Sequence, residues 1–232
     1  MDNILLIETS TALCSVALAQ DGAVTAYRES SAPKAHASLT AVFIQEMLQE
    51  RGLTLADCKA VCVSKGPGSY TGLRVGVSTA KGLCFGSGKP LLAVGTLDTL
   101  VAQAATVIPS EVEGSTFRYI IPMIDARRME VYTAVFENGV QITETAPAII
   151  DETSFAEYLE QGPCLFIGDG AGKCADVIKH PNAHFRQCCP KASAMLQPAM
   201  AAYKEKRFED VAYFEPFYLK EFVATVSKKK LF

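Results

Sequence analysis

Two carboxylates stand where an acid could take part in chemistry, each directly after an apolar run. Glu8 follows residues 3–7, and Asp125 follows residues 120–124. At the end of a buried strand, a carboxylate can hold Mg²⁺ through water or activate a nucleophile. It can equally cap a hairpin turn and accept backbone N–H bonds. The residues alone leave both roles open.

The segments around the two acids look like two copies of one strand-and-hairpin pattern. A second apolar run follows each acid, at residues 14–18 and 131–135, and each copy closes on a hairpin signal, Asp21-Gly22 or Asn138-Gly139. The acid and the turn glycine are equally far apart in both copies. This duplication predicts two lobes that face each other across a cleft, a plan shared by many ATPases and kinases.

A glycine-rich turn, Gly66-Pro67-Gly68-Ser69-Tyr70-Thr71-Gly72, lies between a predicted strand and a predicted helix. Its N–H groups could cradle an anion, because glycine allows positive φ and a close approach. The candidate nucleotide or phosphate site comprises Glu8, Thr9, Gly66, Gly68, Ser69 and Asp125. The alternative is a tight strand-to-helix turn in which Ser69 or Thr71 caps the helix.

Two further patterns do not meet the requirements of the sites that they resemble. The segment Gly168-Asp169-Gly170-Ala171-Gly172-Lys173 looks like a P-loop, but Ile167 replaces the first required glycine and Cys174 follows the lysine. His180, His184, Cys188 and Cys189 are spaced loosely like zinc ligands, but no second ligand pair exists elsewhere. We therefore expect no metal site.

Two predicted helices carry more small and apolar surface than one lobe needs. The helix predicted over residues 71–86 has Gly72, Gly76 and Ala80 on one side, and each helical glycine costs about 1 kcal/mol against alanine. The helix predicted over residues 35–51 has a wide apolar face. Both features predict a partner surface, unless the same chain covers them. The candidate partner-interface residues are Leu39, Phe43, Met47, Leu73, Gly76 and Ala80.

The composition is that of an ordinary globular protein of 232 residues, with 49% hydrophobic and 20% charged residues. The net charge of −3 does not indicate a surface that attracts nucleic acid. The basic run at residues 228–230 is typical of a solvated tail. No stretch is apolar enough for a membrane span. Eight cysteines at irregular positions favour reduced core thiols, so we expect a cytoplasmic protein.

Alternating strands and helices predict a mixed α/β sheet in each lobe. In the first lobe, residues 1–108, the elements expected besides the hairpin are strands at 23–29, 59–64 and 91–95 and helices at 35–51, 71–86 and 96–106. In the second lobe, residues 109–232, they are strands at 140–150 and 164–168 and helices at 153–160, 172–179 and 191–206. The polar segment 109–116 is the predicted boundary.

Four segments carry a family resemblance across nearly the whole chain. They are Ile7-Glu8-Thr9-Ser10, the highly specific run from Gly66 to Gly76, residues 125–132, and the closing Glu215-Pro216-Phe217-Tyr218-Leu219-Lys220. Together they resemble the bacterial TsaB (YeaZ) family. The resemblance implies a duplicated actin-like (ribonuclease-H-like) ATPase fold, with two lobes that each hold a mixed sheet flanked by helices.

The resemblance also implies a role in making threonylcarbamoyladenosine beside the anticodon of tRNA. In that family TsaB is the non-catalytic partner of TsaD, which transfers the threonylcarbamoyl group, and of TsaE, an ATPase. We therefore expect a scaffold subunit that binds TsaD directly, forms a homodimer when alone and meets tRNA only indirectly. No intrinsic cofactor is expected, while ATP or ADP with Mg²⁺ at the complex interface is left open.

Two departures bear on activity. The catalytic relative TsaD carries His-x-x-x-His metal ligands where this chain has Thr96 and Leu100, so we expect the transferase metal site to be absent. Glu8 stands where the TsaB pattern usually has Asp, which would shift any bound cation. The competing hypothesis is an active Mg-dependent ATPase or kinase that uses Glu8 and Asp125. A protease is disfavoured, because no Ser-His-Asp arrangement is visible.

Overall fold

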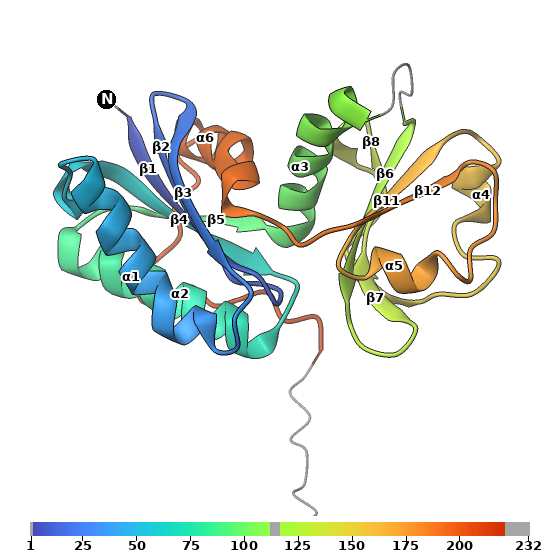
Figure 1. The fold of residues 1–232 in the computed structure, drawn as a ribbon, viewed down its shortest axis with the longest axis horizontal. Coiled ribbons are helices and arrows are strands. Elements are labelled where there is room, and N and C mark those ends of the chain that lie inside the picture. Colours follow the sequence, from blue (N-terminus) through green and yellow to red (C-terminus); the bar gives the residue numbers. More distant parts are fainter. Residues whose placement is uncertain (1, 112–116, 221–232) are drawn as a thin grey trace, which may run out of the picture.

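The computed structural model describes residues 2–111 and 117–220. Two lobes lie side by side, each built on one sheet with helices packed on its faces (Figure 1). The basic run at residues 228–230 and most of the predicted boundary, residues 112–116, lie outside the described residues. None of the helices within residues 2–111 and 117–220 combines the length and the apolar character that a membrane span requires.

The first sheet has the strand order β3-β2-β1-β4-β5. Its strands are β1 (Asn3–Glu8), β2 (Cys14–Gln20), β3 (Ala23–Ser30), β4 (Cys58–Gly66) and β5 (Leu91–Gly95). β1 pairs antiparallel with β2 and parallel with β4, so the sheet is mixed, as predicted. Helices cover both faces of the central strand, which is why β1 is buried along its whole length and is almost entirely apolar.

Helices from two distant parts of the chain cover this sheet. α1 (Ala35–Glu50) and α2 (Tyr70–Ser87) pack on one face, and the short 3₁₀ helix η1 (Leu55–Asp57) precedes β4. The opposite face is covered by the 3₁₀ helix η2 (Ala192–Met195) and by α6 (Leu196–Lys204). Pro198 falls in the first turn of α6, where its missing N–H breaks no helical bond.

The second sheet repeats the plan of the first, in the order β10-β7-β6-β11-β12. Its strands are β6 (Tyr119–Asp125), β7 (Glu130–Thr133), β10 (Ala146–Ile149), β11 (Cys164–Gly168) and β12 (Ala183–Gln187). β6 pairs antiparallel with β7 and parallel with β11, as β1 does with β2 and β4. The duplication read from the two acids is therefore confirmed.

The two lobes exchange covering helices. α4 (Ala156–Leu159) and α5 (Ala171–Cys174) pack on one face of the second sheet. The other face is covered by α3 (Thr96–Glu111), whose Leu100 and Ala104 pack with Ile124 and Ile167. The helix expected over residues 96–106 of the first lobe thus also covers the second sheet. The division into residues 1–108 and 109–232 stays a prediction, but α3 and α6 both pack across it.

Both predicted hairpin turns are present, and both need positive φ at their two central residues. Asp21 and Gly22 join β2 to β3 with φ of 49° and 83°. Asn138 and Gly139 have φ of 51° and 78°, and they join β8 (Phe136–Glu137) to β9 (Val140–Gln141), a small hairpin beside β6. These angles are the type I′ combination that Asx-Gly pairs adopt most readily.

The remaining differences lie in the second lobe. The strand expected over residues 140–150 is wrong, because the chain leaves β9 at Gln141 and re-enters the sheet only at β10. β12 lies between the helices expected at 172–179 and 191–206, where no element was expected, because its half-buried residues show no clear alternation. The expected helices at 153–160 and 172–179 shrink to the single turns of α4 and α5. All eight cysteines are free and six are buried, in agreement with reduced core thiols.

Candidate functional site

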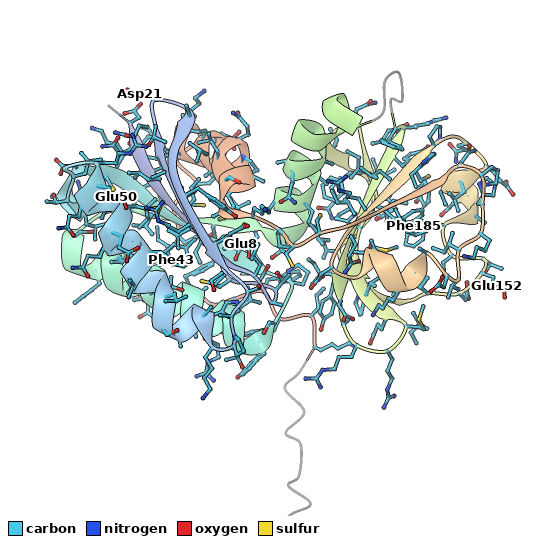
Figure 2. All side chains as sticks on the ribbon, viewed as in Figure 1. Glu8, Asp21, Phe43, Glu50, Glu152 and Phe185 are labelled. Atoms are coloured by element: carbon cyan, nitrogen blue, oxygen red, sulfur yellow. The ribbon has the colours of Figure 1, made fainter. Side chains whose placement is uncertain are left out.

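Glu8 and Asp125 play the same local role in the two lobes. Glu8 ends β1 and is completely buried, and one of its carboxylate oxygens accepts the backbone N–H of Ser10 at 2.7 Å (Figure 2). Asp125 ends β6, and its Oδ1 accepts the backbone N–H of Arg127 at 2.8 Å. Each acid thus binds the N–H two residues further on, which is the turn-capping role that the sequence left open.

The environment of Glu8 favours its neutral form. Among the described residues, Oε2 of Glu8 has no hydrogen-bond partner. Burial raises the pKa of Glu8 above its ordinary value, and the hydrogen bonds from Ser10 and Ser64 lower the pKa by less. Magnesium prefers ionised oxygen ligands that keep several waters around the metal. This buried carboxyl therefore does not fit a magnesium site.

Asp125 is exposed, but its carboxylate is already engaged. Lys173 Nζ donates to Asp125 Oδ1 at 2.5 Å and to the carbonyl oxygens of Arg128 and Glu130, each at 2.7 Å. An ammonium group has three protons, so these three acceptors satisfy it. Lys173 therefore braces the turn between β6 and β7. The lysine of the P-loop-like pattern has a structural role, for which the sequence held no signal beyond the lysine itself.

The glycines of the same pattern let the chain lie against β6. A Cβ atom at Gly168 would come within 2.1 Å of the Met123 carbonyl oxygen, and one at Gly170 within 2.9 Å of Val131 Cγ1. Asp169 Oδ1 accepts the backbone N–H of Asp125 at 2.9 Å. Burial raises the pKa of Asp169, and the hydrogen bond from the Asp125 N–H lowers this pKa by a smaller amount. The segment after β11 is thus fitted to the acid-bearing end of β6.

The glycine-rich turn before α2 fits tightly against the loop after β1. The Ser69 N–H donates to the Ser10 carbonyl oxygen at 2.6 Å. A Cβ atom at Gly68 would lie 2.3 Å from that oxygen, and one at Gly72 would lie 2.1 Å from the Thr9 carbonyl oxygen. Ser69 Oγ accepts the Gly72 N–H at 3.3 Å and caps α2. Contacts within the chain therefore account for these glycines, and a phosphate here stays a prediction.

A cavity of about 650 Å³ lies between this turn and the second lobe. Its lining includes Gly68, Ser69 and Asp125 of the predicted phosphate site, together with Arg127. Glu8 and Thr9 are fully buried and do not line it. Gly66 lines a second cavity instead, where its missing side chain admits the backbone of Phe217. The six predicted residues therefore do not line one cavity, and a nucleotide or phosphate site built from them stays a prediction.

The predicted partner-interface residues divide into two groups. Met47, Leu73 and Ala80 have no exposed surface, and Gly76 is buried against Thr9, where a Cβ atom would come within 2.1 Å of Oγ1. These four residues belong to the chain's own core, so their assignment to a partner surface is wrong. Leu39 and Phe43 are half-buried on α1. Phe43, labelled on that helix in Figure 2, also packs against the first core.

The positions aligned with the metal ligands of TsaD lie in the core. Thr96 and Leu100 are completely buried at the start of α3. In the part of the chain that the structure describes, no group of three or more His, Cys, Asp or Glu side chains could hold a metal ion. His184 instead packs edge-on against Phe117, with ring centres 5.1 Å apart.

Comparisons with known proteins agree on one family. A family model described as TsaD, tRNA N6-adenosine threonylcarbamoyltransferase, matches residues 28–227. The chain is 34% identical to the tRNA threonylcarbamoyladenosine biosynthesis protein TsaB of Escherichia coli, over 95% of this chain and 96% of the relative. The structure of YeaZ from Pseudomonas aeruginosa superposes with a TM-score of 0.79 and 26% identity, over 94% of this chain and all of that one.

A more distant likeness concerns the fold alone. The activator of 2-hydroxyisocaproyl-CoA dehydratase from Clostridium difficile, solved with bound ADPNP, is 12% identical, with a TM-score of 0.50 over 88% of this chain and 96% of that one. The duplicated sheets and these likenesses establish the actin-like, ribonuclease-H-like fold. With near-complete coverage at 34% identity, the chain belongs to the TsaB family of tRNA threonylcarbamoyladenosine biosynthesis proteins.

Proposed function

We propose that this protein is a non-catalytic scaffold subunit for threonylcarbamoyladenosine synthesis, which binds and supports TsaD together with TsaE. The observation that carries the proposal is the outer face of α1 and α2. Both helices cover one side of the first sheet and turn their other side outwards (Figure 1). The partner surface is thus assigned to a different side of α2 from the one expected from Gly76.

Two stripes of small residues run along α2. The chain's own core covers one of them, and we assign the other to a partner protein. The inner stripe, Gly72, Gly76 and Ala80, is buried in the chain's own core. The outer stripe, Ser78, Gly82 and Gly86, is exposed, and a Cβ atom at Gly82 or Gly86 would meet nothing within 4 Å. Because a helical glycine costs about 1 kcal/mol against alanine, the close approach of another chain is a reason to keep the outer glycines.

Large apolar side chains accompany the outer stripe. Phe85 of α2 is 87% exposed and Val42 of α1 is 41% exposed, with half-buried Leu39 and Phe43 on α1. Aromatic side chains are enriched at the centre of protein–protein interfaces, and the small residues beside Phe85 leave room for a close approach. A second copy of the chain could cover the same face, which accounts for a homodimer when TsaD is absent.

The non-catalytic role is supported by the two acids. Glu8 is buried with a raised pKa, and the Asp125 carboxylate binds Lys173, so neither is free to organise magnesium for an ATPase. Tight Mg-ATP binding by the isolated chain, lost in Glu8→Ala, would favour the ATPase hypothesis instead.

Calorimetric titration with TsaD tests the surface. Gly82→Leu and Phe85→Ala should each weaken binding, by roughly 30-fold if the residue is a hot spot of about 2 kcal/mol. Neither change touches the core, so circular dichroism should be unaltered. Ile149→Ala is the matched control, because Ile149 is 77% exposed but lies on β10 of the second lobe. Undiminished binding of both α2 variants would show that this face is not the interface.

A reconstituted tRNA modification assay tests the scaffold role. Supplied with tRNA and an activated threonylcarbamoyl donor, TsaD and TsaE with this chain should form threonylcarbamoyladenosine. Gly82→Leu should lower the yield in proportion to lost binding at limiting subunit concentration. The chain without TsaD should form none. Modification by the chain alone would contradict the proposal.

A further inference from the structure

Residues 205–220, which follow α6, wrap around the first lobe, and we call this segment the belt. Glu209 pairs with Leu91 on the open edge of β5, and its N–H donates to the Leu91 carbonyl oxygen at 2.9 Å. The chain then reaches the face covered by α1 and α2, where Val211 and Phe214 pack on the core. Lys81 of α2 fastens it there by donating to the carbonyl oxygens of Ala212 and Phe214, at 3.1 and 3.0 Å.

The belt continues to the glycine-rich turn. The Phe217 N–H donates to the Lys65 carbonyl oxygen at 2.7 Å. Gly66 has φ of 106°, and a Cβ atom there would lie 2.8 Å from the Phe217 carbonyl oxygen. Only glycine therefore permits this backbone to dock at this point. The next ring, Tyr218, packs on Tyr70 at the start of α2 with ring centres 5.0 Å apart.

The last described residue of the belt crosses to the other lobe. Lys220 forms an ion pair with Glu130, the first residue of β7, and its Nζ lies 5.8 Å from the ring centre of Tyr132. Residues 217–220 thus contact β4 and α2 of the first lobe and β7 of the second. Figure 1 shows the red end of the chain reaching the region between the lobes.

The covalent connections between the lobes lie elsewhere. One leads from β5 into α3 at Gly95 and Thr96, and the other passes through residues 188–191. The Gln103 side chain of α3 anchors the second connection. It donates to the Cys189 carbonyl oxygen at 3.1 Å and accepts the Lys191 N–H at 3.0 Å. Both connections lie above the belt's end in the view of Figure 1.

We propose that residues 217–220 form a clasp that fixes the opening between the two lobes, with Lys220 as its fastening on the second lobe. The clasp also supplies one wall of the cavity of about 650 Å³, which Phe217, Tyr218, Leu219 and Lys220 line. Releasing Lys220 frees the β6–β7 turn from α2, whereas the covalent connections and the core of each lobe stay intact.

The clasp makes a prediction about salt. The Lys220 and Glu130 side chains are 40% and 23% exposed, so dissolved ions reach the pair and weaken it. Hydrogen exchange in residues 126–133 of the full chain should therefore speed up between about 0.05 M and about 1 M NaCl. Strands β1 and β11, inside the two cores, should not respond.

Lys220→Met tests the fastening, because methionine keeps much of the apolar stem and removes the charge. At low salt it should speed exchange in residues 126–133 by roughly two- to five-fold, the range for a partly exposed ion pair. It should also reduce the response to salt, and the part that remains belongs to the Lys173–Asp125 pair at the same turn. It should also enlarge the radius of gyration measured by solution scattering. Lys204→Met, an exposed lysine of α6, is the control and should behave as wild type.

Two outcomes would overturn the clasp. In the first, Lys220→Met leaves exchange in residues 126–133 and the scattering profile unchanged. In the second, exchange rises equally in β1 and β11, which would assign Lys220 to general stability. Tyr218→Ala provides a second variant, because it loosens the hold on Tyr70 without touching Glu130. It should speed exchange in residues 126–133 while keeping a weaker salt response.

Discussion

Glu8 couples the stability of the first lobe to pH. Its pKa is raised in the folded chain because the carboxyl is fully buried, whereas in the unfolded chain the group keeps its ordinary value near 4.5. Above that pH the unfolded chain loses the proton first, so the folded state holds more protons and stability falls as pH rises. The fall ends once the pH passes the folded pKa.

Glu8→Gln should remove this dependence. The amide has no charge to desolvate, and its NH₂ group can stand in for the carboxyl O–H. The variant and wild type should differ little at pH 4, and the variant should gain at higher pH by at most about 1.4 kcal/mol per pH unit. Urea unfolding across this range measures the difference. A variant that loses stability at pH 8 would mean that the folded protein needs the carboxylate charge.

At the same scale, the sequence found both acids but could not assign their roles. The type and spacing of Glu8 and Asp125 are the same in a turn cap and in a magnesium site. Burial of one and the Lys173 bond of the other distinguish these roles, and both depend on chain segments far away in sequence. The P-loop-like pattern is the one feature of the sequence that singles out Lys173.

At the scale of elements, most strands and helices of the first lobe follow from apolar runs and glycine signals. β5 and β11 have the expected bounds, and α1 and α2 differ from expectation by a residue or so at their ends. What periodicity could not supply was the direction in which each face of α2 points. Every helix carries several stripes, and only the packed sheet shows that Gly76 faces Thr9 and that Gly82 faces outwards.

The two stripes of α2 predict opposite effects of the same substitution. Gly72→Ala places a Cβ atom 2.1 Å from the Thr9 carbonyl oxygen, so the backbone must shift, at a cost of about 1–3 kcal/mol. Gly82→Ala meets nothing within 4 Å and should stabilise the isolated chain by about 0.5–1 kcal/mol, because alanine favours helix. Thermal and urea unfolding of the two variants measure both signs. Equal effects would refute the assignment of inner and outer sides.

At the scale of the whole molecule, the lobes are duplicated in topology but not independent in packing. The core face of the first sheet that contains Ile4 and Leu6 is covered by α6, and the face of the second sheet that contains Ile124 is covered by α3. A boundary placed by composition could not reveal this exchange, because both helices are amphipathic and would suit either sheet. The chain should therefore unfold as one cooperative unit rather than lobe by lobe.

Residues 1–108 expressed alone should not fold. They lack η2 and α6, so Ile4, Leu6, Leu92 and Val94 would face water. At about 1.5–3 kcal/mol for each large side chain, that loss is comparable with the whole stability of a domain, about 5–15 kcal/mol. The fragment should bind a hydrophobic dye and give poorly dispersed amide resonances. Joining residues 2–95 through a flexible linker to residues 190–218 restores the cover and should recover a cooperative transition. A fragment 1–108 that unfolds cooperatively by itself would show that the exchanged helix is dispensable.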